Sequence, residues 1–329
     1  MKIRKIGIFI VCIFLGTTCL AGCSIGDTKV VFQADLAQKE VFEINKKPCS
    51  LSEAKVFLTN YQNIYATMYG VDLWKHDFGN GGLYKYVKEL TISQLAQIKS
   101  MISLAEQEDI MLTEDELEKI KVAAKEYYDS LTEKEIQYME ISQGTIEELY
   151  RQYGLANKLY THLTTGVNDE VSDDEARIIQ ATQIYIKSEM MAKEIKNKLD
   201  QGGDFASLAS TYNEAVDNDI TFGRGVLPKE VEEAAFAMET NDIIGYIETE
   251  GGYYFLKCIN NYNQELTDEN KLVIVEKRRK EKFDDVYDEF VLSLPSKFNK
   301  VLWDAVEIEI NSQITTSSFF EVYDKYCKW

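Results

Sequence analysis

Side chains that commonly act as nucleophiles, general bases or metal ligands are sparse in this chain. Its 329 residues include two histidines, His76 and His162, and six cysteines. The sequence has no Cys-x-x-Cys pair and no cysteine–histidine ligand spacing, which excludes a zinc or thioredoxin-type site. The acidic run 168–175 lacks the central glycine and terminal glutamate of a calcium-binding EF-hand loop. We therefore expect no metal and no cofactor, and we interpret this run as a hinge followed by a helix cap.

The densest group of recognisable sequence words lies between residues 178 and 257. A strand-like run, Ile178–Ile186, has Gln183 near its centre, and a helix pattern follows it. Five further words then come in order: 201–204 (QGGD), 205–209 (FASLA), 222–225 (FGRG), 230–236 (EVEEAAF) and 251–257 (GGYYFLK).

The order and spacing of these words resemble the parvulin-type peptidyl-prolyl isomerases, over about a quarter of the chain. The resemblance implies a small domain, residues 172–262, in which helices pack on a central antiparallel sheet. It also implies a site that works without nucleophile or metal. The barrier to cis/trans rotation about a peptide bond is about 18–20 kcal/mol, because the bond has partial double-bond character. An isomerase site must therefore favour the twisted amide. Such sites hold the proline ring on a shelf of Met or Leu and Phe. Two histidines lie beneath, with a Cys or Asp facing them and a Ser or Thr nearby.

Transferred position by position, this set is only partly kept. Leu227 stands at the Met/Leu position and Thr249 at the hydroxyl position. Four positions have lost the expected residue: Val231 replaces the pocket Phe, Gln183 the first-strand histidine, Tyr254 the last-strand histidine and Ala215 the Cys/Asp. We expect Gln183 and Tyr254 to lie on adjacent central strands and to hydrogen-bond each other. The resemblance thus implies a parvulin fold with weak or no isomerase activity, and it names no catalytic residue.

The first residues have the order of a bacterial lipoprotein leader. Three basic residues precede the apolar run Ile8–Leu15, which is too short to span a bilayer. The Leu-Ala-Gly-Cys that follows resembles a lipobox, which implies that residues 1–22 are a signal peptide and that Cys23 carries a lipid. An ordinary secretory signal and a short uncleaved anchor are the alternatives. Residues 23–38 are expected to form a tether, holding the body at the outer face of the membrane of a Gram-positive cell.

The net charge of the chain limits the kinds of molecule that it is expected to bind. A net charge of −19 argues against nucleic acid and against electrostatic binding to anionic lipid, and it favours cationic clients. Beyond Cys23, the cysteines are Cys49, Cys258 and Cys327. Two alternatives stay open: a disulfide bridge between Cys49 and Cys327, or three free thiols.

Helical periodicity dominates the N-terminal half. One helix is predicted to end at Gly70, and a second has apolar residues on one side. The residues on that side are Leu95, Ile98, Ile102 and Ala105. Ser/Thr-x-x-Glu capping boxes predict helix starts at Thr113, Thr132, Thr145 and Ser172. The alternating run Val306–Ile310 predicts a strand that pairs with Val41–Ile44 and joins the two ends of the chain.

This layout resembles the PrsA/SurA-type extracytoplasmic foldases. The expected fold class is α+β. A mostly helical domain, similar to the SurA N-domain, is formed by 39–168 and 263–329, with the parvulin-like domain 172–262 inserted. The resemblance implies a membrane-anchored chaperone for unfolded or nascent secreted polypeptides. An isomerase with a rearranged site and a non-catalytic envelope or solute-binding lipoprotein are the alternatives. The sequence identifies neither the clients nor the angle between the domains, and it leaves a homodimer open.

Overall fold

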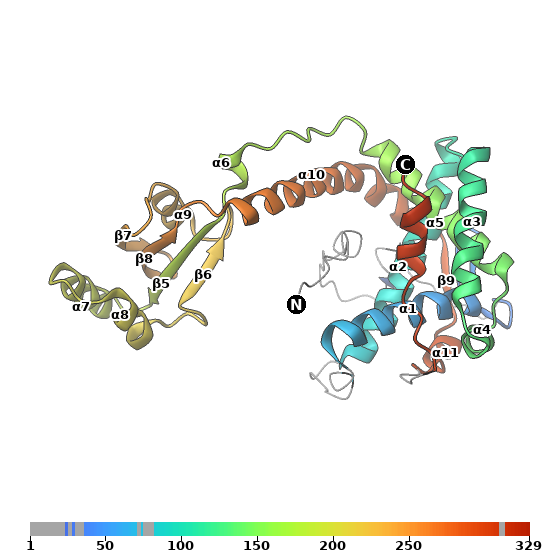
Figure 1. The fold of residues 1–329 in the computed structure, drawn as a ribbon, viewed down its shortest axis with the longest axis horizontal. Coiled ribbons are helices and arrows are strands. Elements are labelled where there is room, and N and C mark those ends of the chain that lie inside the picture. Colours follow the sequence, from blue (N-terminus) through green and yellow to red (C-terminus); the bar gives the residue numbers. More distant parts are fainter. Residues whose placement is uncertain (1–23, 26–27, 30–35, 71–73, 75–81, 309–312) are drawn as a thin grey trace. The chain divides into compact units, whose positions relative to one another are not determined.

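The computed structural model describes the chain except residues 1–23, 26–27, 30–35, 71–73, 75–81 and 309–312. The predicted signal peptide, the predicted lipid site at Cys23, part of the predicted tether and His76 therefore lie outside the described residues. The chain forms two compact units, one from Met1–Thr165 with Glu281–Trp329 and one from Gly166–Lys280. The predicted α+β class, with a mainly helical unit built from both ends of the chain, is confirmed (Figure 1).

The first unit contains two small sheets and most of the helices. Its described elements are β1 (Ser24–Ile25), β2 (Thr28–Lys29), β3 (Glu40–Ile44), β4 (Lys47–Ser50), α1 (Leu51–Tyr69), α2 (Gly82–Gln107), α3 (Glu114–Ser130), α4 (Glu133–Met139), α5 (Gln143–Leu163), β9 (Ser296–Phe298), α11 (Lys300–Asp304) and α12 (Phe319–Tyr326).

The second unit is built on one antiparallel sheet. Its described elements are α6 (Asp173–Ala176), β5 (Ile179–Ile186), α7 (Glu189–Asp200), α8 (Phe205–Tyr212), β6 (Asp219–Phe222), α9 (Lys229–Phe236), β7 (Ile243–Thr249) and β8 (Gly252–Asn260). Helix α10 (Gln264–Leu292) contributes residues to both units. None of the described helices combines the length and the apolar composition needed to cross a membrane.

Local capping sets the starts of the helices in the first unit. Thr113 and Thr132 form the predicted capping boxes of α3 and α4, in which hydroxyl and carboxylate each bind a free backbone N–H. The prediction at Thr145 is wrong, because α5 begins one turn earlier: Ser142 is its N-cap and Thr145 occupies the N3 position of the box. Gly70 ends α1 at a φ of 80°, which a glycine adopts without strain.

The two ends of the chain meet in the three-stranded sheet β4-β3-β9. Strand β3 pairs with β9, with Phe42 opposite Phe298. The predicted partner, Val306–Ile310, is wrong: residues 306–308 form no strand, and 309–310 lie outside the described residues. Alternation of apolar side chains is a short-range signal, whereas strand pairing is decided by the long-range register.

Apolar helix faces fill the core of the first unit. The predicted face of α2 is buried, since Leu95 and Ala105 have no exposed surface and Ile98 and Ile102 are 5 to 6% exposed. Burying a side chain of this size stabilises the fold by about 1.5–3 kcal/mol. Aromatic side chains from α1, α3, α5 and α12 complete this core.

In the second unit, the sheet order is β6-β5-β8-β7, so β5 and β8 are the central strands. Helices α7 and α8 cover one face through Ala192, Ile195 and Phe205. Helix α9 packs on the other face through Val231 and Ala235, next to Leu256 of β8. The strands alternate between these two cores because successive side chains point to opposite faces.

Candidate functional site

Gln183 lies at the centre of β5, on the face of the sheet that α9 covers. It pairs with Leu256 across the strands, so it shares a face with Leu256 and Tyr254. The prediction that Gln183 and Tyr254 occupy adjacent central strands is confirmed. The predicted hydrogen bond between them is wrong, because the Gln183 Nε2 donates instead to the carbonyl oxygen of Asp217 at 2.9 Å.

Tyr254 packs against a second tyrosine. Tyr185 lies directly opposite it on β5, and the two ring centroids are 4.9 Å apart. The Tyr185 hydroxyl donates to the carbonyl of Gly251 at 2.5 Å. Burial raises the pKa of Tyr254, and the Tyr185 nearby adds to the rise, so its hydroxyl stays protonated at neutral pH.

An apolar shelf borders these polar groups. Val231 on α9 is fully buried, and Leu227, which precedes α9, is half-buried against the same cluster. Leu256 and the ring of Tyr254 belong to this cluster too. The shelf is aliphatic at Val231, where the predicted family pattern has a phenylalanine, and Val231 and Leu256 have no exposed surface, so Leu227 and Tyr254 are the members of this set that reach solvent.

The loop between α8 and β6 is organised by Asn213. Its Oδ1 accepts from the backbone N–H of Tyr185 (2.9 Å) and of Ala215 (3.2 Å). Its Nδ2 donates to the carbonyl of Asp217 at 3.0 Å, the same oxygen that binds Gln183. Ala215 is half-buried and carries only a methyl group, so this position supplies neither an acid nor a thiol.

Thr249 lies at the end of β7, in the turn to β8. It pairs with Gly252, and its hydroxyl donates to the Gly252 carbonyl at 2.8 Å. A Cβ at residue 252 would come within 2.5 Å of the Ile186 carbonyl oxygen, so glycine is required there. The hydroxyl of Thr249 is therefore used to close the hairpin.

The six predicted positions thus lie on one unit and are linked through β5 and β8. Sequence reasoning missed Tyr185, Asn213 and Asp217. Tyr185 is two residues from Gln183 and so points to the same face of a strand, a signal that was present. Asn and Asp also bind nearby backbone groups in turns, which marks the loop 213–217.

Chemically, this surface presents the half-buried Leu227 and the phenol groups of Tyr185 and Tyr254. It offers no imidazole pair and no general acid–base partner at the six positions. Within the described ranges, no group of three or more His, Cys, Asp or Glu side chains is arranged to hold a metal ion.

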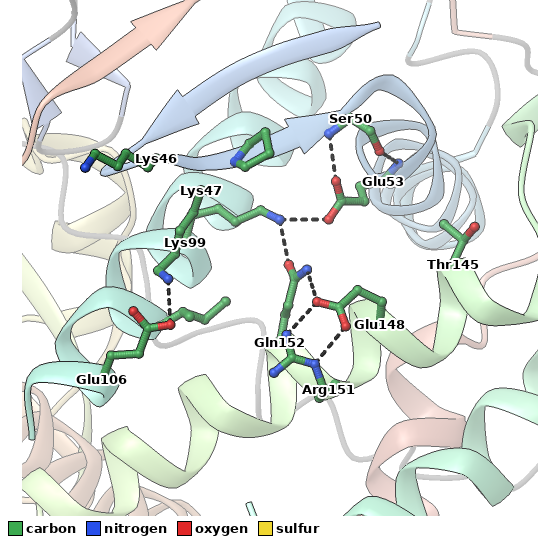
Figure 2. A pocket seen from close by; sticks show the side chains of 12 residues that line it. Lys46, Lys47, Ser50, Glu53, Lys99, Glu106, Thr145, Glu148, Arg151 and Gln152 are labelled. Carbon is green, nitrogen blue, oxygen red and sulfur yellow. Dashed lines mark hydrogen bonds and ion pairs between the residues drawn. The ribbon is translucent and has the colours of Figure 1, made fainter. Parts of the chain in front are cut away.

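A separate polar cavity of about 460 Å³ lies in the first unit, between β4, α1, α2 and α5 (Figure 2). Lys99 is buried there and donates to Glu53 Oε1 at 2.8 Å and to Gln152 Oε1 at 2.7 Å. Gln152 Nε2 donates to Glu148, whose carboxylate also accepts from Nε and Nη2 of Arg151. Opposite charges pair within this network, so it ties α1, α2 and α5 together.

Residues 173–260 match the family model of the PPIC-type PPIASE domain, which is described as a rotamase. The predicted parvulin resemblance is confirmed. The match coincides with the unit that holds the six positions and covers the whole of its four-stranded sheet.

Curated relatives of the chain include foldases. The chain is 27% identical over 280 residues to the foldase protein PrsA of Caldanaerobacter subterraneus subsp. tengcongensis, a match that covers 77% of this chain and 82% of the relative. It is 32% identical over 147 residues to the foldase protein PrsA of Geobacillus kaustophilus, covering 43% of this chain and 50% of that relative. The crystal structure of the peptidylprolyl isomerase PrsA from Bacillus cereus aligns with a TM-score of 0.38 and 19% identity, over 87% of this chain and 99% of that one.

Proposed function

We propose that this chain is an extracytoplasmic foldase, anchored by a lipid on Cys23, that binds unfolded or nascent secreted polypeptides. The PPIC-type match at residues 173–260 and the similarity to a foldase over 82% of its length support this proposal. We also propose the predicted domain limits. These are a signal peptide (1–22), a tether (23–38), a helical chaperone domain (39–168 with 263–329) and a parvulin-like domain (172–262).

The PPIC-type domain in this proposal holds proline but isomerises it weakly. The observation that carries this is the engagement of Gln183, whose amide donor is bound to Asp217, at the position of a catalytic imidazole. One preorganised donor is worth about 2.7–4 kcal/mol of barrier in enzyme sites. Losing that donor alone lowers kcat/KM by about a hundredfold or more.

Two assays on one preparation of the full chain test the proposal. We expect an equimolar amount to slow aggregation of a denatured secreted protein, and we expect isomerisation of a proline peptide to stay near its uncatalysed rate. Aggregation that continues at the same rate with excess chain would refute the chaperone function.

A second candidate is an isomerase that uses Tyr254. Its hydroxyl makes no hydrogen bond within the described chain and lies beside the apolar shelf, so it is free to bind a substrate amide. Tyr254→Phe would then lower isomerisation at least tenfold, while Tyr246→Phe, on the far face of the sheet, would not. A parent chain with no measurable activity rules this candidate out.

The anchor and the oligomeric state need their own measurements. Labelled palmitate is expected to enter the parent chain and not the Cys23→Ala variant. Sedimentation of the full chain decides whether it is a homodimer.

A further inference from the structure

Residues 166–176 connect α5 to β5 and include the short helix α6; we call this segment the linker. The chain passes between the two units twice, once between Thr165 and Gly166 and once within α10, between Lys280 and Glu281. The linker begins at the first of these crossings, and the residues of α10 that it contacts lead up to the second. Its contacts with α10 therefore determine how firmly the two connections are held together.

The C-terminal end of the linker is fixed by buried hydrogen bonds. Ala176 has no exposed surface, and its carbonyl oxygen accepts from Asn270 Nδ2 of α10 at 2.9 Å. The N–H of Ile178 donates to Oγ1 of Thr267 at 3.1 Å, and Thr267 is fully buried. Breaking such bonds leaves buried polar groups without partners, which is costly. This end of the linker therefore stays in place, and we call it the anchor.

The rest of the linker lies at the surface of α10. None of the residues 166–175 is buried. Arg278 of α10 binds three points of this stretch: its Nη1 donates to the carbonyl oxygens of Asn168 and Glu170 at 3.0 Å each. Its Nη2 donates to Glu175 Oε1 at 2.6 Å. The several donors of one guanidinium group thus bind backbone and side chain together.

Two further cations bind acidic side chains of the linker. Lys271 Nζ lies 2.5 Å from Asp173 Oδ1. Arg224 donates to the carbonyl oxygen of Asp174 at 3.0 Å and to its Oδ2 at 2.7 Å. The side chains of Asp173, Asp174 and Glu175 are 42 to 70% exposed. Ion pairs with this exposure are individually weak and are screened by salt, so residues 166–175 can separate from α10 far more easily than the anchor can.

We propose that the linker is a salt-sensitive latch on α10. In the closed state, Arg278, Lys271 and Arg224 bind residues 166–175 and hold the two connections between the units together. In the open state, these residues leave the surface of α10 while the anchor at Ala176 holds. The continuous helix α10 is then the ordered connection, and the PPIC-type unit gains freedom of motion. The acidic run that the sequence suggests is a hinge acts as one only when the latch is open.

Cleavage of the full chain by the protease Glu-C after Glu170 measures this opening. The carbonyl of Glu170 must leave Arg278 before the protease can attack it. Mass spectrometry identifies the cut, and a short glutamate-containing peptide corrects for the effect of salt on the protease. At low salt, we expect Arg278→Gln to be cut there roughly tenfold faster than the parent chain. The parent chain should be cut roughly threefold faster in about 0.5 M NaCl than at low salt.

Arg279→Gln is the matched control. It removes the same charge from the next residue of α10, where Arg279 pairs with Glu276 of the same helix, so it should be cut at the parent rate. Unchanged cleavage elsewhere in the chain verifies that each variant is folded. If Arg278→Gln is misfolded, Lys271→Gln releases Asp173 instead and should also speed the cut. Equal rates for all chains, an equal effect of Arg279→Gln, or a parent rate that ignores salt would overturn the inference.

Discussion

Removal of the buried ammonium group of Lys99 is expected to destabilise the first unit strongly. The side chain of Lys99 is 3% exposed and that of its partner Glu53 is 12% exposed. Lys99→Met keeps the aliphatic stem but leaves the Glu53 carboxylate and the Gln152 carbonyl without their donor. Removing one partner of a buried pair costs about 3–5 kcal/mol. Because Glu53 keeps some contact with solvent, we expect a loss of about 3 kcal/mol.

The position of the tryptophans gives a clean assay. All three tryptophans, Trp74, Trp303 and Trp329, lie in the first unit, so their fluorescence follows the unfolding of that unit alone. In urea, the midpoint of Lys99→Met should fall with an unchanged slope. In a thermal scan, 3 kcal/mol corresponds to a decrease of about 6 to 12 °C for a unit of roughly 200 residues.

Two further variants separate the mechanism from a general packing effect. The double variant Lys99→Met/Glu53→Gln should recover about 1–2 kcal/mol, because glutamine removes the unpaired charge and still closes the capping box with Ser50. Lys121→Met is the control: its pair with Glu118 lies at the surface, with side chains 51% and 69% exposed, so we expect no measurable change in the urea midpoint. A single variant that loses less than 1 kcal/mol, or a double variant that recovers nothing, would refute the reasoning.

Three more variants test other parts of the structure. Burial raises the pKa of Asp324 to about 6, above the value of about 3.9 in an unfolded chain. The folded state therefore binds a proton at Asp324 more tightly than the unfolded chain does. The free energy of unfolding is highest below about pH 4 and falls as the pH rises to about 6. Asp324→Asn should raise stability at pH 7 by about 2 kcal/mol and flatten the urea midpoint over that range; an unchanged pH profile contradicts this. Gly245→Ala would place a Cβ 2.1 Å from the Phe255 ring, costing about 3 kcal/mol. The PPIC-type domain should become protease-sensitive while tryptophan fluorescence stays constant, and equal resistance would disprove the clash. Lys88 is 8% exposed and donates to backbone carbonyls at the end of α11. Lys88→Met should lower the free energy of unfolding, measured in urea, by about 2 kcal/mol. A loss within experimental error would show that water replaces the ammonium group.

Patterns within a few residues of each other were read correctly from the sequence. The capping boxes at Thr113 and Thr132 and the buried face of α2 are confirmed, because each depends on contacts within one or two helical turns. Thr145 shows the limit of this reasoning. Ser142 and Thr145 both suit a cap, and the chain uses the earlier one because Thr145 can itself close the box.

Some features of the candidate site were likewise predictable from the sequence, and others were not. Its residue types, the absence of imidazoles and the adjacency of the strands that hold Gln183 and Tyr254 follow from the sequence and its resemblance to the parvulin pattern. The partner of Gln183 does not, because Asp217 lies 34 residues along the chain, beyond the reach of a local pattern.

The sequence by itself determined where α3 and α4 begin, which face of α2 is apolar and which side chains stand at the six predicted positions. Only the tertiary structure decided that β3 pairs with Ser296–Phe298, that Gln183 binds a loop carbonyl, and that Glu135 and Asn60 bind backbone N–H groups between Thr315 and Phe319. The physical reason is that these contacts join segments far apart in the chain. Several segments have a suitable local pattern, and the register of the packed core selects among them.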